Sequence, residues 1–266
     1  MNKFKGYLIC TDCDGTLTDK NGIVSQKNAE AIRYFQSEGG LFTLATGRFP
    51  GHMKQFEHQF EINAPIVSMN GTALYDTKKD CAIRTWPMKT SDCKELFYHI
   101  NQNWRQIWEY WFNYTCHNST GYKPMEHGIC DESLETFFAD FPEELFKIVT
   151  VQPEDVTYIL QKDLKEKFGE KFRFDTSWAN GLEIQSWDSG KGVAVRYMKE
   201  HMNNDIHTTV GIGDYENDIS LLECADIGFA VANALDSVKA VADRITVSNN
   251  ESAIADVILQ LEKMKS

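Results

Sequence analysis

The chain has 266 residues, of which 42% are hydrophobic and 25% charged, and its formal net charge is -12 at pH 7. This length can bury a substantial core, and the composition is that of a soluble globular protein with one large or two ordinary domains. The negative charge argues against nucleic acid or an anionic membrane as the partner. A bound phosphate would therefore need local cations or a metal.

Targeting and membrane signals are not evident in the sequence. No apolar run approaches the roughly 20 residues of a membrane span, and the N-terminal run is too short for a signal peptide. The 7 cysteines lack the density of a disulfide scaffold, so we expect reduced thiols in a cytoplasmic protein. Cys10 and Cys13 have a C-x-x-C spacing, but no second pair follows to complete a metal site. No obligate protein partner is evident.

The first 70 residues alternate between apolar strands and helices. Strands are predicted at 7–10, 41–45 and 65–69, and helices from the Ser25 cap to about Ser37 and at 51–60. Gly39-Gly40 ends the first helix, and Asn21-Gly22 before it is a hairpin-turn signal. This alternation predicts a parallel sheet with right-handed crossovers.

The segment from about Thr72 to Trp187 has a different pattern, typical of an α+β insert. Its predicted elements are a hairpin of strands 73–75 and 82–86, helices at 91–101, 133–139 and 153–168, and strands at 104–114, 146–151, 172–177 and 182–187. The strand at 104–114 carries aromatic residues at even positions: Trp104, Trp108, Tyr110, Phe112 and Tyr114. We expect that face to pack on a helix rather than to line a pocket.

The alternation of helix and strand resumes at Lys191. Helices are predicted at 191–202, 219–224, 236–241 and 251–263, and strands at 208–212, 227–231 and 245–247. The predicted fold class is therefore α/β, with a doubly wound, mainly parallel, Rossmann-like sheet and an inserted α+β domain.

Acidic and polar residues stand where the predicted strands end. Asp12 and Asp14 follow the first strand, Thr46 the second and Asn70 the third. Open α/β sheets bind ligands at the carboxyl ends of their strands, so these residues are expected to gather along one edge. One carboxylate of the first pair can act as a nucleophile and the other as an acid and base, or both can hold a divalent cation.

The last third adds Lys191 at a helix start, and Asp214, Asn217 and Asp218 after the strand at 208–212. Each candidate has an ordinary structural alternative: a solvated strand end, a simple turn, a surface lysine or a capped helix. Taken together and in this order, the candidates favour a shared site, because the α/β topology could bring all of these positions together.

In that order the residues resemble the haloacid-dehalogenase (HAD) superfamily, over nearly the whole chain. Its four motifs are matched by Asp12-Cys13-Asp14-Gly15-Thr16-Leu17, Ala45-Thr46-Gly47-Arg48, Lys191-Gly192 and Gly213-Asp214-Tyr215-Glu216-Asn217-Asp218. Asn70-Gly71-Thr72 and the strand containing Glu183 are similar to type IIB, the Cof-like phosphatases.

Spacing supports the same subclass. Few residues separate Leu17 from Ser25, whereas about 145 separate Thr46 from Lys191, enough for an inserted domain. We therefore predict a catalytic core of residues 1–83 and 188–266, and a cap domain of residues 84–187 that sets specificity.

The resemblance implies a role for each matched residue. Asp12 is the expected nucleophile and Asp14 the general acid and base. Mg²⁺ is expected at Asp12, the Asp14 carbonyl, Asp214 and waters placed by Asp218. The expected phosphate ligands are Thr46, Lys191 and Asn217, and the substrate pocket is expected to include Gly47, Arg48, Asn70 and Gly71. In the cap, the strand at 108–114, the Lys123 loop and the turn at 178–180 are further candidates.

The implied activity is a Mg²⁺-dependent phosphatase of small phosphorylated metabolites, sugar phosphates first, acting through an aspartyl-phosphate. The aromatic residues of the cap also leave a nucleotide-like or vitamin phosphate open. Two alternatives stand beside this function: a phosphomutase of the same superfamily, and a catalytically silent ligand-binding module on the same fold.

Overall fold

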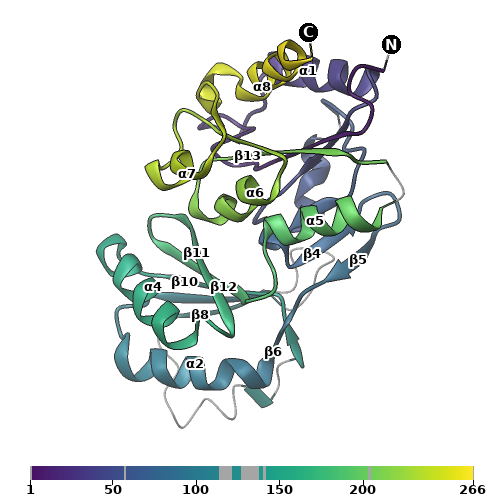
Figure 1. The fold of residues 1–266 in the computed structure, drawn as a ribbon. Helices are drawn as coiled ribbons and strands as arrows, with labels where there is room; N and C mark the ends of the chain where they lie inside the picture. The colour runs from purple at the N-terminus through teal and green to yellow at the C-terminus, as the bar shows by residue number, and fades with distance from the viewer. Residues whose placement is uncertain are drawn as a thin grey trace.

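The computed structural model describes residues 2–56, 58–113, 122–126, 138–139, 142–202 and 205–265. It has two lobes, one built on a parallel sheet and the other on an antiparallel sheet (Figure 1). Both chain termini lie on the parallel lobe. Among the described residues, no helix has the length and hydrophobicity needed to cross a membrane.

The parallel sheet has the strand order β15-β14-β13-β1-β2, and all its neighbours run parallel. Its strands are β1 (Tyr7–Thr11), β2 (Leu41–Leu44), β13 (Thr208–Gly213), β14 (Ile227–Ala230) and β15 (Arg244–Ile245). β1 is flanked by β2 and β13, so the N-terminal and C-terminal parts of the chain form one sheet. This confirms the predicted α/β fold class.

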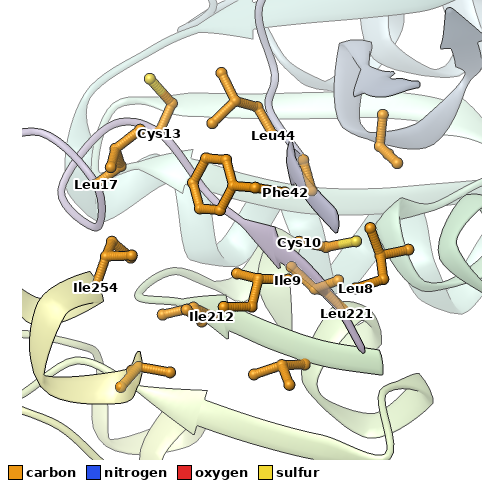
Figure 2. Packing of buried hydrophobic residues seen from close by; sticks show 14 of the residues in the cluster. Leu8, Ile9, Cys10, Cys13, Leu17, Phe42, Leu44, Ile212, Leu221 and Ile254 are labelled. Atoms are coloured by element: carbon orange, nitrogen blue, oxygen red, sulfur yellow. The ribbon is translucent and has the colours of Figure 1, made fainter. Parts of the chain in front are cut away.

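Helices cover both faces of the parallel sheet. α1 (Gln26–Ser37) packs against α8 (Ala253–Met264), and α5 (Lys191–His201) packs against α6 (Ile219–Cys224), on opposite sides of β13 (Figure 1). A further helix, α7 (Asp236–Val241), follows β14. Ser25 caps α1 as predicted, since its side chain accepts a hydrogen bond from the Asn28 N–H. Figure 2 shows Ile9, Phe42 and Ile212 packed with Leu17 and Ile254 in the core of this lobe.

A small antiparallel sheet follows β2. It consists of β3 (Ile66–Ser68), β4 (Ala73–Asp76) and β5 (Cys81–Thr85), and a single parallel bridge between Ala45 and Val67 joins it to the main sheet. The helix predicted at 51–60 is instead a short 3₁₀ helix, η1 (Pro50–Phe56). The third predicted strand, β3, thus lies beside the end of β2 as expected, but it belongs to this separate antiparallel sheet and not to the parallel one.

The antiparallel lobe has the strand order β11-β12-β10-β7-β8. Its strands are β7 (Glu109–Asn113), β8 (Tyr122–Glu126), β10 (Lys147–Val151), β11 (Phe172–Trp178) and β12 (Gly181–Ser186), with a small ribbon of β6 (Met88–Lys89) and β9 (Glu144–Leu145). Helices α2 (Thr90–Asn103) and α4 (Glu154–Phe168) pack on one face of this sheet. α2 lies on the side away from the parallel lobe (Figure 1).

The aromatic strand predicted at 104–114 is shorter than expected. It begins at Glu109, because α2 extends to Asn103 and the Trp104 N–H still donates to the Ile100 carbonyl at 2.7 Å. Tyr110 and Phe112 pack on Phe97 of α2, with ring centroids 5.6 and 5.4 Å apart, which confirms the expected helix packing. Tyr114 and most of the helix predicted at 133–139 lie outside the described residues.

The two lobes have separate hydrophobic cores. Trp86 packs in the core of the parallel lobe, and Met88 in that of the antiparallel lobe. The division predicted at 83–84 falls within β5, shortly before this change, and that at 187–188 falls between β12 and α5. We call the antiparallel lobe, from β6 to β12, the cap, and the remainder the core.

Candidate active site

Lys191 joins two acids from distant parts of the chain. It is the first residue of α5, has no exposed surface, and its Nζ donates to Asp12 Oδ1 at 2.6 Å and to Asp218 Oδ1 at 2.5 Å. Asp12 directly follows β1, and Asp218 ends the 3₁₀ helix η3 (Glu216–Asp218) after β13. Three strand ends and helix starts thus meet in one buried charged cluster.

The charges in this cluster depend on one another. Burial favours a lower pKa for Lys191, but Asp12 and Asp218 outweigh it and raise that pKa, so the ammonium keeps its proton. Burial raises the pKa of Asp12 well above its usual range, while Lys191 acts in the opposite direction. The ammonium is therefore the main local compensation for the buried acids among the described residues.

Asp214 completes a group of carboxylates suited to a cation. Asp12, Asp214 and Asp218 each offer an oxygen within 4.8 Å of the others, and hard divalent cations prefer such oxygen ligands. The Thr16 hydroxyl donates to Asp214 Oδ1 at 2.6 Å and orients it. Burial and, next, repulsion from Asp218 raise the pKa of Asp214 to about 7. A bound cation would relieve this repulsion.

The second carboxylate oxygens of Asp218 and Asp214 have different surroundings. Asp218 Oδ2 accepts the backbone N–H of Asp214 at 2.9 Å and of Tyr215 at 3.2 Å, so Asp218 mainly shapes the loop. Gly15 has a φ of 84°, and a Cβ there would lie 2.5 Å from Asp214 Oδ2. The close approach of the Gly15 backbone to Asp214 therefore requires glycine.

Asp12 and Asp14 do not point the same way. β1 ends at Thr11, and the turn at Gly15 leaves Asp12 buried and Asp14 exposed. Arg48 Nε donates to Asp14 Oδ2 at 2.8 Å, and Arg48 Nη2 bonds the other oxygen. The hydrogen bonds to Asp14 raise the pKa of Arg48. Arg48 thus holds the Asp14 carboxylate in place.

The loops after β2 and β3 pack beside the cluster of Lys191, Asp12 and Asp218. Thr46 is buried; its hydroxyl accepts the Arg48 N–H at 3.1 Å, and its carbonyl accepts the Asn70 N–H at 2.9 Å. Asn70 has a left-handed φ of 56°, and its Oδ1 accepts from Asn217 Nδ2 at 3.1 Å. Gly71, with a φ of 92°, lies so close to α5 that a Cβ would be 2.6 Å from the backbone nitrogen of Lys191.

A cavity of about 560 Å³ lies between core and cap. Its lining residues are Asp12, Asp14, Gly47, Arg48, Phe49, His52, Tyr215 and Asn217 from the core, and Trp111, Lys147, Val149, Val151, Ser177, Trp178 and Glu183 from the cap. The other site residues predicted from the sequence are not among the lining residues: Thr46, Asn70, Gly71, Lys191, Asp214 and Asp218. Three of them lie directly behind lining residues, because Lys191 bonds Asp12, Thr46 bonds Arg48 and Asn70 bonds Asn217.

Sequence reasoning missed a buried ion pair in the cap wall. Lys147 Nζ lies 2.7 Å from Glu183 Oε1, and both side chains are almost fully buried. Lys147 also donates to the Gly47 carbonyl at 3.0 Å, and Asn70 Nδ2 donates to Glu183. A signal was present, because the predicted strands at 146–151 and 182–187 each carry one charged residue, and a charge that becomes buried needs a partner.

Glu216 is a second residue that the sequence did not single out. Its Oε2 accepts from Thr176 Oγ1 at 2.8 Å and from Gln161 Nε2 at 2.9 Å, both in the cap. Glu216 lies in the same short loop as Asp214 and Asp218. The position of the cap is therefore linked to the loop that carries the acids.

The cap candidates from the sequence have mixed outcomes. Trp178 of the predicted turn lines the cavity, whereas Asn180 is not among the lining residues. In β7 the cavity residue is Trp111, at an odd position, and the even-numbered rings face the helix. The side chain of Lys123 lies outside the described part of the structure.

Comparison with known proteins gives a consistent result. The sequence model of the haloacid dehalogenase-like hydrolases matches residues 9–258. The 5-amino-6-(5-phospho-D-ribitylamino)uracil phosphatase YitU of Bacillus subtilis is 26% identical over 268 residues, which cover 94% of this chain and 96% of YitU. Phosphatase YwpJ of the same organism is 25% identical, and the match covers 96% of this chain and 99% of YwpJ.

A solved structure has the same fold over both lobes. The HAD subclass IIB sugar phosphatase BT4131 matches with a TM-score of 0.76 at 17% identity, over 96% of this chain and 98% of its own. At this identity the match shows a shared fold, with core and cap alike.

Proposed function

The chain belongs to the haloacid dehalogenase-like hydrolases, and from this premise we propose that it is a Mg²⁺-dependent phosphatase of small phosphorylated metabolites. Membership confirms the superfamily resemblance seen in its motifs, and phosphatases are among its full-length relatives. The observation that carries the proposal is the buried Lys191, bonded to Asp12 and Asp218 beside the cavity.

In the proposed mechanism, Asp12 is the nucleophile. Its carboxylate attacks phosphorus, and the bond from phosphorus to the leaving oxygen breaks as an aspartyl-phosphate forms. Asp14 gives a proton to that oxygen, and then takes one from the water that attacks the intermediate and releases inorganic phosphate. Lys191, Thr46 and Asn217 bind the non-bridging oxygens, where negative charge is concentrated.

A Mg²⁺ ion fits the donor set, because three carboxylate oxygens, one each from Asp12, Asp214 and Asp218, lie within 4.8 Å of one another. We propose that Asp12, Asp214, Asp218 and the Asp14 carbonyl would hold the ion. When bound, it offsets the charge of the phosphoryl group.

The proposed substrates are phosphate esters of hydroxylated metabolites, with sugar phosphates as the first class. The cavity of about 560 Å³ has the size of a small-molecule site. YitU is named for a phosphorylated ribitylamino-uracil and BT4131 for sugar phosphates, so both relatives support a phosphorylated, hydroxyl-bearing substrate. The free thiols at Cys10, Cys13, Cys81, Cys93 and Cys224 agree with the proposed cytoplasmic location.

The test is phosphate release from a panel of phosphorylated metabolites, with Mg²⁺ or with a chelator. We expect turnover only with the metal, and none in Asp12→Asn. Asp236→Asn, the same change at a fully exposed acid, serves as the control and should behave like the parent protein.

Other outcomes separate the alternatives. An isomerised phosphate ester in place of free phosphate would identify a mutase, and binding without turnover a silent module. Undiminished activity in Asp12→Asn would refute the proposed nucleophile.

A further inference from the structure

We propose that the cap selects a two-part leaving group, with a hydroxylated segment next to phosphorus and a flat aromatic ring beyond it, and that Trp111 and Trp178 bind the ring. The inference rests on the proposed phosphatase function and deepens it by naming the substrate class. Its basis is the arrangement of side chains on the cap face that closes the cavity.

Strand register places these side chains in order. Val149 of β10 pairs with Trp111 of β7 on one side and with Glu183 of β12 on the other. Because side chains alternate along a strand, Lys147 and Val151 share the face of Val149. All five residues line the cavity. The cap face therefore has a charged region at Lys147 and Glu183 and an apolar region at Trp111, Val149 and Val151.

The charged region lies next to the proposed reaction centre. Lys147 Nζ donates to the Gly47 carbonyl at 3.0 Å, directly beyond the Thr46 position. Glu183 accepts from Asn70 in the core and, at 2.6 Å, from Ser177 Oγ in the cap. Ammonium, carboxylate and hydroxyl groups together offer donors and acceptors, as a hydroxylated segment requires.

The apolar region ends at Trp178. β11 and β12 shift register between Thr176 and Trp178, and Gly181, next to this shift, pairs with Val151. A Cβ at Gly181 would overlap the Trp178 ring, so the missing side chain gives that ring its place. Trp178 keeps 40% of its surface exposed although it lines the cavity.

Two indoles in one cavity suit a flat ring. Trp111 is also oriented, because its Nε1 donates to Glu109 Oε2 at 3.1 Å. Aromatic surfaces favour stacked or edge-on contact with another ring, and such contacts tolerate different ring systems. The geometry therefore points to a ring that follows the hydroxylated segment, rather than to a simple sugar phosphate alone.

The first experiment compares matched esters. The value of kcat/KM is measured for flavin mononucleotide against ribitol 5-phosphate, and for uridine 5′-monophosphate against ribose 5-phosphate. Within each pair the phosphorylated segment is the same, and the ring takes the place of one hydroxyl group. We expect the ring-bearing ester to be preferred by about tenfold or more in at least one pair. Phosphate release with no ring preference in either pair would overturn the inference alone, whereas no release from any ester would count against the proposed phosphatase.

The second experiment changes the indoles. Trp111→Leu and Trp178→Leu should each lower the ring preference about fivefold to tenfold. The preference is a ratio measured on one preparation, so a loss of folded protein cancels out. Trp187→Leu removes a tryptophan that is 63% exposed and not among the lining residues, and it should keep the ratio.

Gly181→Ala tests the placement of the ring without touching the proposed substrate site directly. The added methyl group must displace the Trp178 indole, so the preference should fall as in Trp178→Leu, and the double variant should lose no more than either single change. An unchanged preference in both Trp111→Leu and Trp178→Leu would overturn the proposal.

Discussion

At Lys191 a single ammonium forms ion pairs with two buried carboxylates, Asp12 and Asp218. Its bonds to Asp12 and Asp218 are 2.6 and 2.5 Å long in a region with almost no exposed surface. Removing one partner of a buried ion pair leaves an uncompensated charge, which costs far more than the pair contributes. The site and the stability of the core are therefore coupled through this residue.

Replacing Lys191 by methionine should lower the free energy of unfolding by about 3–5 kcal/mol and activity by at least about a hundredfold. Added Mg²⁺ should restore part of the stability, because a second cation can occupy the acid cluster. Urea unfolding with and without Mg²⁺ measures both effects. A variant of unchanged stability would show that the acids are compensated in another way.

The raised pKa of Asp214 predicts that the affinity for Mg²⁺ depends on pH. Its pKa is raised from 3.8 to about 7 in the folded protein, so between these values the metal-free fold holds a proton that the unfolded chain has lost. In that range the free energy of unfolding falls as pH rises. A cation must displace the same proton, so Mg²⁺ affinity should weaken about tenfold per unit below pH 7 and level off above it.

Isothermal titration calorimetry between about pH 5.5 and 8 measures this dependence, and Asp214→Asn should make it shallower. A flat affinity for the parent protein across the acid range would contradict the raised pKa.

Candidate site residues at the ends and starts of predicted elements could be predicted from the sequence. Residues that reach the cavity only through the packing of distant strands could not. Asp12, Lys191 and Asp214 stand at the ends and starts of elements that the sequence predicts, and the fold brings them together. The candidate strand at 108–114 contains Trp111, but its aromatic pattern marks the even-numbered positions, which pack on α2 and face away from the cavity. Lys147 escaped because its partner, Glu183, lies on a different strand.

Among the elements, the tight turn between β3 and β4 positions the start of α5. Gly71 has a positive φ and presses against the Gly190 carbonyl and the Lys191 nitrogen. Any side chain there must displace the helix start that carries the buried ammonium. The turn is thus a structural support for the site rather than a simple connection.

Gly71→Ala should lower the free energy of unfolding by about 2–4 kcal/mol and reduce kcat, because strain and overlap add. Gly22→Ala is a matched control, since Gly22 also has a positive φ but nothing within 4 Å of its Cβ position. It should cost only about 1 kcal/mol and leave kcat unchanged. Equal effects of the two changes, measured by urea unfolding and steady-state kinetics, would argue against the contact with α5.

Elements with strong local signals were predicted well. α6 and α7 have the predicted bounds, and α1 begins at the predicted Ser25 cap. The segment at 51–60 failed as a regular helix, and only a short 3₁₀ helix forms there. Strand β15 is limited to two residues, because its length depends on pairing with β14, which local sequence does not reveal.

For the whole molecule, the cap is linked to the core on both sides of the cavity. On one side, Phe146 of the cap packs with Phe49 and Met69 of the core. On the other, Glu216 accepts two hydrogen bonds from the cap. The spacing of the motifs predicts a cap between Thr46 and Lys191, whereas these contacts could not be predicted, because they depend on side chains that meet only after both lobes fold.

Glu216→Ala should raise KM about fivefold to tenfold, because it removes two hydrogen bonds to a carboxylate that hold the cap near the substrate. The fold should persist, since both cores remain intact. Steady-state kinetics measures KM, and hydrogen exchange at Thr176 reports the loss of the contact. An unchanged KM would show that the cap position does not depend on Glu216.

The proposed chemistry can be tested most directly by trapping the intermediate at Asp12. The enzyme is mixed with a phosphate ester that it hydrolyses, and the reaction is quenched in acid within one turnover. Borohydride is then added, which reduces an acyl phosphate on aspartate to homoserine. We predict homoserine at position 12, found by peptide mass spectrometry, only when the ester was present. Active enzyme with an unmodified Asp12, or with the modification at another acid, would contradict the account.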